Sequence, residues 1–135
     1  MKKRMLALAM ILILVLTSTV FAYAEEQSRE TMGVTFSISR VSRTSAAATV
    51  DVTFVALVDS YNVTIYLQKK VDGRWVSDVA NEDYVYSKSG VNAYDYMFNH
   101  IYTNLEANTN YRLKCVSRDT TGTNTYSTTT YSNQF

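Results

Sequence analysis

The chain is poor in the residues that cross-link small proteins and carry much of enzyme chemistry. Its 135 residues include one cysteine, one histidine, four glycines and no proline. The single cysteine, Cys115, excludes an intrachain disulfide, so the fold depends on its apolar core. With a single histidine, His100, the sequence disfavours both a Ser-His-Asp triad and a His-based metal site. We expect no catalytic residue, no metal and no cofactor, with Cys115 buried and inert and His100 structural or on the surface.

The first 24 residues have the pattern of an export signal. A positive start, Lys2 to Arg4, precedes an almost wholly apolar run over 5–20, and Ala22-Tyr23-Ala24 has small residues where signal peptidase cleaves. This pattern predicts a helical signal peptide over 1–24 and a polar lead-in over 25–32. The mature protein is expected to be secreted or associated with the cell wall, and the compact signal is typical of bacterial export. The alternative is that the apolar run is retained as a membrane anchor, since about 20 apolar residues span a bilayer.

Charge of neither sign dominates the remainder. Without Lys2, Lys3 and Arg4, ten basic residues face twelve acidic ones, a formal net charge of −2. That balance excludes the strongly basic footprint of a nucleic-acid-binding domain. Cleavage after position 24 leaves 111 of the 135 residues, which suits one domain. We expect a monomer with no nucleic-acid partner and no membrane contact after cleavage.

The composition after the signal favours β-strands. Tyrosine, threonine and valine are abundant, and no stretch after residue 30 keeps a helical apolar period over three turns. Apolar and polar residues alternate instead, and Asp72-Gly73 is a strong hairpin signal. Seven or eight short strands predict a single antiparallel β-sandwich over 33–135. The main expected strands cover 34–41, 49–54, 63–68, 74–76, 92–103, 111–118 and 124–132, with breaks at 43–45, 59–60 and 119–122.

Aromatic residues between positions 75 and 96 are the candidate binding surface. Ser87-Lys-Ser-Gly90 is a turn signal, and a turn centred there would place Tyr84 opposite Tyr94, with Tyr96 on the same face. Packing alone explains such cross-strand pairs, which contribute about 0.2–1 kcal/mol each. If the face is exposed, it forms a flat strip for sugar stacking or for a protein partner. The candidate surface consists of Trp75, Tyr84, Tyr86, Tyr94 and Tyr96.

The segment over 105–122 resembles a corner and the strand that follows it in fibronectin type III domains. Leu105, Thr109 and Tyr111 stand where that family has a leucine, a threonine and a tyrosine, and Ala107-Asn108 replaces its Pro-Gly turn. Asparagine tolerates the left-handed conformation of such a turn. The resemblance implies a buried Tyr111 ring whose hydroxyl bonds to upstream backbone. It also implies inward side chains at 113, 115 and 117, and a turn at 119–122.

The resemblance extends in strand order over 31–135, with departures. The family's usual tryptophan is either replaced by Phe54 or absent, and there is no proline. Cys115 lies four residues after Tyr111 instead of two, unlike an immunoglobulin domain. The family is chiefly adhesive, linking or partner-binding and implies no site residues here. The sequence thus predicts a secreted, non-catalytic module that binds an extracellular protein. The alternatives are a carbohydrate-binding module that uses the surface tyrosines and Trp75, and a small secreted inhibitor.

Overall fold

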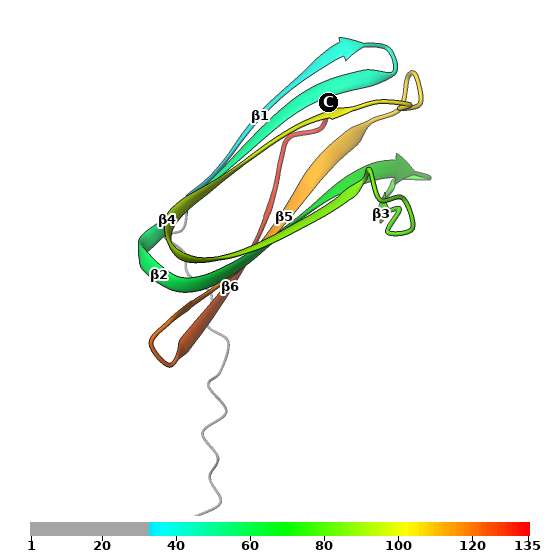
Figure 1. Ribbon diagram of the computed structural model, residues 1–135. Coiled ribbons are helices and arrows are strands. Elements are labelled where there is room, and N and C mark those ends of the chain that lie inside the picture. The colour runs from blue at the N-terminus through cyan, green and yellow to red at the C-terminus, as the bar shows by residue number, and fades with distance from the viewer. Residues whose placement is uncertain (1–32) are drawn as a thin grey trace, which may run out of the picture.

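The computed structural model describes residues 33–135, and this part of the chain is all β, as the sequence predicts (Figure 1). No helix occurs among these residues, and so none that could cross a membrane. The predicted signal peptide over 1–24 and lead-in over 25–32 lie outside the described residues. The strands are β1 (Gly33–Ser42), β2 (Ser45–Val71), β3 (Arg74–Ser77), β4 (Val85–Tyr102), β5 (Tyr111–Thr121) and β6 (Asn124–Tyr131).

The strands form one antiparallel sheet that curls, because β2 and β4 are long enough to run through both of its halves. Their shared register shifts between Thr53 and Val58, and Figure 1 shows both strands turning back on the same side of the molecule. Asn92 of β4, with a φ of 50°, lies in this bend. We call β1 with residues 45–53 and 95–102 the first arm. The second arm consists of residues 58–71 and 85–93 with β3, β5 and β6.

One apolar core lies between the two arms. Every second side chain of β5, and of most of β2, is buried, which is the period of a strand with one face on a core. Each fully buried Val, Leu or Ile side chain contributes about 1.5–3 kcal/mol. A single cluster contains buried residues from both arms, among them Ala46, Val50, Val52, Phe54, Val63, Ile65, Leu67, Phe98, Tyr102, Leu113 and Cys115.

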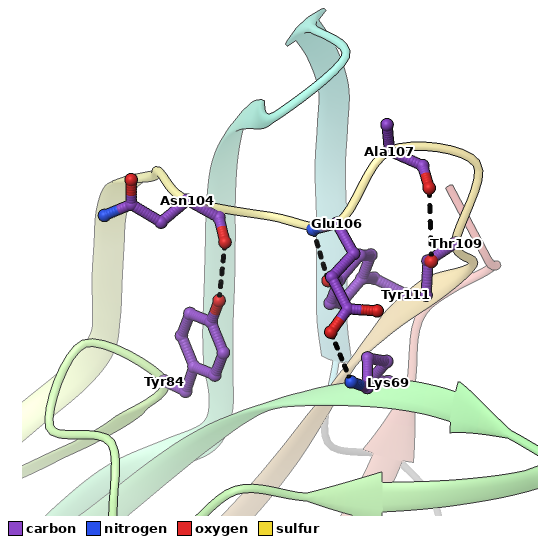
Figure 2. A network of polar contacts seen from close by, with 7 residues as sticks. All are labelled: Lys69, Tyr84, Asn104, Glu106, Ala107, Thr109 and Tyr111. Atoms are coloured by element: carbon purple, nitrogen blue, oxygen red, sulfur yellow. Dashed lines mark hydrogen bonds and ion pairs between the residues drawn. The ribbon is translucent and has the colours of Figure 1, made fainter.

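The corner before β5 ties the two arms together (Figure 2). The Tyr111 ring is buried, and its hydroxyl oxygen accepts a hydrogen bond of 2.8 Å from the Glu106 backbone N–H. Asn108 has a φ of 57°, the left-handed conformation expected of it. From the first arm, the Arg40 guanidinium lies 5.3 Å from the centre of the Tyr111 ring and donates to the Thr109 carbonyl at 2.7 Å. The predicted geometry of this corner is confirmed.

The predicted turn over 87–90 is wrong, because β4 continues through it. The polar residues that suggested a turn are cross-strand hydrogen-bond partners. Asn62 Nδ2 donates to Ser89 Oγ at 2.9 Å and to Ser87 Oγ at 3.3 Å, and the Thr64 hydroxyl lies 3.0 Å from Ser87 Oγ. The second and third predicted strands are likewise one strand, β2, so six strands replace the seven or eight expected.

Other predicted boundaries shift by a few residues. The hairpin at Asp72-Gly73 is confirmed, with φ values of 50° and 77°. The break expected at 59–60 is absent, since the irregularity of β2 lies between Thr53 and Val58. The turn expected over 119–122 lies slightly later, after β5 ends at Thr121, with Gly122 at a φ of 60°.

Candidate binding surfaces

The outer side of the second arm carries aromatic rings in contact with cations. Arg112 of β5 lies at the centre of this cluster. Its guanidinium carbon is 4.6 Å from the centre of the Trp75 ring and 4.1 Å from the centre of the Tyr131 ring. Lys70 Nζ lies 5.6 Å from the centre of the Trp75 ring. These are cation–π distances, and each such contact contributes about 0.5–1 kcal/mol at an exposed site.

Strand register assembles this cluster from four strands. Tyr66 of β2 lies opposite Lys114 of β5, which in turn lies opposite Tyr131 of β6. Lys114 Nζ is 5.4 Å from the centre of the Tyr66 ring. Lys70 of β2 lies opposite Trp75 of β3. Because side chains at every second position share one side of a sheet, all of them point outward. We call this set the basic face: Tyr66, Lys70, Trp75, Arg112, Lys114 and Tyr131.

Gln68, which is only 7% exposed, holds Arg112 in place beneath the basic face. Arg112 Nε donates to Gln68 Oε1 at 2.8 Å, and Gln68 Nε2 donates to Ser77 Oγ at 3.0 Å. The hydrogen bonds of Arg112 to described residues involve Nε alone. Its two Nη atoms therefore keep their donors for a ligand, in the fork geometry that matches a carboxylate.

The outer side of the second arm has cations and no carboxylate within residues 33–135. Its outward positions on β2, β3, β4, β5 and β6 hold Lys, Arg, aromatic, amide, hydroxyl and small apolar residues. Beside the basic face, a ladder of Asn62, Thr64, Ser87 and Ser89 continues the same side. The surface is therefore electropositive and rich in hydrogen-bonding groups.

The tyrosines predicted to form one strip lie before, within and after the bend of β4 along the chain. Tyr86, before the bend, packs 4.9 Å from the Phe98 ring beyond it. Tyr96 also lies near Tyr86, and burial together with a hydrogen bond between the two phenols raises the Tyr96 pKa above its ordinary value. Tyr84 packs against Tyr102, at 6.5 Å between ring centres.

The predicted pairing of Tyr84 with Tyr94 is therefore wrong. Tyr94 is 64% exposed and lies in the bend, where β4 turns from one arm to the other. The structure brings Tyr86 and Tyr96 together and sets Trp75 on the basic face, on another side of the sheet. Tyr84, Tyr86 and Tyr96 thus lie along one row of rings that includes Phe98, His100 and Tyr102, whereas Tyr94 lies in the bend. Of the five predicted residues, Trp75 alone lies in the basic face.

Tyr61 lies at the junction of the two arms. Its ring centre is 5.3 Å from that of Phe54 in the core and 5.8 Å from that of Tyr96. A Cβ atom added at Gly90 would lie 2.5 Å from three atoms of the Tyr61 side chain. An alanine at position 90 would therefore force the Tyr61 ring or the β4 backbone to shift, because the phenol ring rests directly on that backbone.

The lone cysteine and histidine both occupy packed positions. Cys115 is fully buried, and burial raises the pKa of its thiol to about 12. His100 is half-buried and lies between two aromatic rings, 4.7 Å from Tyr102 and 5.8 Å from Phe98. Among residues 33–135, no three or more His, Cys, Asp or Glu side chains gather as a metal site would require.

A hollow of about 470 Å³ lies beside the Tyr111 corner, at the end of the second arm. Lys69 Nζ lines it and lies 2.7 Å from Glu106 Oε1 (Figure 2). The hydrogen bond to Glu106 raises the pKa of Lys69. The Tyr84 hydroxyl donates to the Asn104 carbonyl at 3.4 Å, and burial raises the pKa of that phenol. These polar groups pair with one another, so their evident role is to attach the segment over 103–110 to the sheet.

No family model and no curated protein matches the chain. Two solved structures of Bacteroides uniformis β-glucuronidase 2 are similar, one covalently bound to cyclophellitol-6-carboxylate aziridine and one a calcium-binding mutant. In each, 74% of this chain aligns with 13% of the enzyme chain, at 17% identity and a TM-score of 0.41. The chain thus spans a small part of the enzyme's length. At this level of similarity, the two structures give no information on the function of this chain.

Sequence reasoning found Trp75 and missed the rest of the basic face. Arg112 and Lys114 stand two positions apart on a predicted strand, which places both on its outward side. Their aromatic partners Tyr66 and Tyr131 come from other strands and meet them only through strand register. The alternation of inward and outward residues along this strand could therefore have predicted the outward position of the two cations. No local pattern could have predicted their contacts with aromatic rings from other strands.

Proposed function

We propose that the mature chain is a secreted, non-catalytic module that binds an acidic surface of an extracellular protein through its basic face. The export pattern over 1–24 supports secretion. A β-sandwich of fibronectin type III character is part of the proposal. The single core between the arms and the buried Tyr111 corner support it. The proposal assigns no catalytic residue and no cofactor.

One observation carries the proposed ligand class, namely the position of Arg112. Its Nε is anchored on buried Gln68, and its plane is in contact with the rings of Trp75 and Tyr131. An arginine that is held in this way loses little side-chain entropy when its Nη atoms bind a carboxylate. Lys70 and Lys114 add positive charge on either side, and no carboxylate of residues 33–135 competes on this side of the sheet.

The proposal is tested with poly-L-glutamate as the acidic polypeptide. Arg112→Ala/Lys114→Ala removes two cations of the basic face, and Arg74→Ala/Lys88→Ala removes two exposed cations outside it. Both variants change the net charge equally. We expect roughly tenfold weaker binding for the first variant, since each exposed charge pair contributes about 0.2–1 kcal/mol and charge-assisted hydrogen bonds contribute more. Equal weakening by both variants, measured by titration at low and at physiological salt, would overturn the proposal.

A carbohydrate-binding module is the second candidate. Trp75 lies on the same side of the sheet as the ladder of hydroxyl and amide groups formed by Asn62, Thr64, Ser87 and Ser89. Aromatic rings beside such groups suit sugar stacking with hydrogen bonding. However, the cations over the Trp75 ring reduce the area left for an uncharged sugar.

A glycan array with Trp75 fluorescence as the readout separates the two candidates, because Trp75 is the only tryptophan. The protein-binding proposal expects no change of fluorescence with neutral sugars. A saturable change that Trp75→Phe abolishes would favour the carbohydrate module. A small secreted inhibitor, the third candidate, would instead form a tight protein complex in a pull-down from culture supernatant and would show no glycan affinity.

A further inference from the structure

β4 has an open edge along the first arm. Residues 95–102 pair with β2 on one side, and no other described strand pairs with β4. The outward-directed backbone N–H and C=O groups of an edge strand are therefore available to a further strand. Such an edge is either protected by its side chains or used for pairing.

The segment over 96–102 lacks the usual protection. It reads Tyr-Met-Phe-Asn-His-Ile-Tyr, with no Asp, Glu, Lys, Arg, proline or glycine. Proteins blunt their edges with lysine, proline or bulges, and this uncharged, aromatic composition is instead typical of segments that pair with their own copies. Met97 is 58% exposed and Ile101 is 63% exposed, both on the outer side of the strand.

The other open edges of the described sheet differ from this one. The outward row of β1 contains Thr35, Ser37 and Ser39, and that of β6 contains Thr125, Ser127 and Thr129. Apart from Val41 at the end of β1 and Tyr131 at the end of β6, these rows offer little exposed apolar area. The edge of β4 is therefore the one best suited to strand addition.

We propose that two copies of this chain associate by antiparallel pairing of their β4 edges, centred on Asn99. About this centre, Asn99 of each copy lies opposite Asn99 of the other, and Met97 lies opposite Ile101. Antiparallel neighbours of this kind interact directly, and apolar and amide pairs of this kind are favourable. Asn99 Oδ1 already accepts from Thr49 Oγ1 at 2.7 Å, which leaves its Nδ2 for the partner amide.

The same register suits the inner side of the strand. Phe98 lies opposite His100, and Tyr96 opposite Tyr102, so aromatic rings meet across the junction. Asp95, the charged residue at the start of this arm of β4, lies opposite Thr103 instead of another carboxylate. The pairing is isologous and closed, and it joins two three-stranded arms into one continuous sheet. It replaces the monomer that the sequence predicts, and it does not involve the basic face.

Cysteine substitutions test the register directly. Opposite Cα atoms of antiparallel strands are about 4.5–5.5 Å apart, within the range of about 4.4–6.8 Å that a disulfide bridges. Mild oxidation of Asn99→Cys should therefore give a covalent dimer on a non-reducing gel. Met97→Cys should not, because its two copies lie about 13 Å apart along the strands. An equal mixture of Met97→Cys and Ile101→Cys should give the mixed dimer. The wild type controls for Cys115, which is buried.

Sedimentation of the mature chain supplies an independent readout. The wild type should dimerise with rising concentration, and Met97→Lys/Ile101→Lys should remain monomeric. The two should share one thermal midpoint at low concentration, where both are monomeric, since dimerisation itself raises the midpoint. Mixing that variant with Met97→Glu/Ile101→Glu should restore association. The matched control Val41→Lys places a charge on the β1 edge and should change nothing. A monomeric wild type at every concentration, or cross-linking of Asn99→Cys no faster than that of Met97→Cys, would overturn the proposal.

Discussion

The two arms share one core and differ in what they present to solvent. Outward positions of the second arm hold Arg112, Lys114 and their aromatic partners, without a carboxylate. Outward positions of the first arm hold hydroxyl and amide groups, Asp51 and Asp95, and the exposed apolar Met97. The inward residues of both arms are mainly apolar and belong to one cluster. The inward-facing side chains of each strand thus determine the fold. The outward-facing side chains determine which partners each arm can bind.

The largest expected effect falls on the corner that both arms share. Tyr111→Ala removes a buried ring that contacts Arg40 of the first arm, and such truncations cost about 3–5 kcal/mol. Tyr111→Phe keeps the ring and removes only the acceptor for the Glu106 N–H, at about 1 kcal/mol. The free energy of unfolding in urea measures both. A loss below about 1 kcal/mol for Tyr111→Ala would mean that the corner does not join the arms.

The junction of the arms should respond to a single methyl group. Gly90→Ala places a Cβ atom against the Tyr61 ring and should destabilise the fold by about 1–3 kcal/mol through overpacking. Gly33→Ala is the matched control, since its Cβ atom would meet nothing closer than 3.8 Å. Urea unfolding of both variants measures the difference. Equal effects at the two positions would show that Tyr61 does not rest on β4.

High pH should weaken the shared core. Burial raises the pKa of Cys115 to about 12 in the folded state, from an ordinary value of 9.0. The unfolded chain therefore releases this proton first, so the stability contributed by the neutral thiol is complete below pH 9 and declines as the pH rises towards 12. We expect a loss of about 1 kcal/mol by pH 10, measured by urea unfolding. Cys115→Val should make this part of the profile shallower, with the remaining slope due to the phenols of Tyr84 and Tyr96, whose pKa values are also raised by burial. An identical slope in the variant would contradict the assignment.

The smallest effect on the shared core should come from the basic face, which lies outside it. Arg112→Ala removes two cation–π contacts worth about 0.5–1 kcal/mol each and the hydrogen bond to Gln68, worth about 1 kcal/mol, and none of these contacts belongs to the core. The emission of Trp75 should change clearly, because the guanidinium leaves its ring. Arg74→Ala, which lies on the other side of β3, should leave the emission as it is. No spectral difference between the variants would mean that Arg112 is not seated on Trp75.

Local signals predicted much of the fold. Asp72-Gly73, Asn108 and Tyr111 each act within a few residues of themselves, and the structure confirms their predicted conformations. The course of β4 could not be predicted in this way, because Ser87 and Ser89 resemble a turn until their partner Asn62 is known. The basic face could not be predicted for the same reason, because the register between distant strands brings its residues together. Sequence reasoning therefore succeeded where a residue's partner is near in the chain and failed where it is distant.

The difference between the arms can be measured directly by following backbone amide chemical shifts of the mature chain as poly-L-glutamate is added. The account predicts saturable shifts at Lys70, Trp75, Arg112 and Lys114 that weaken with salt, and none at Thr49, Met97 or Asn99 of the first arm. Shifts that centre on the first arm, or that follow every exposed cation alike, would contradict it.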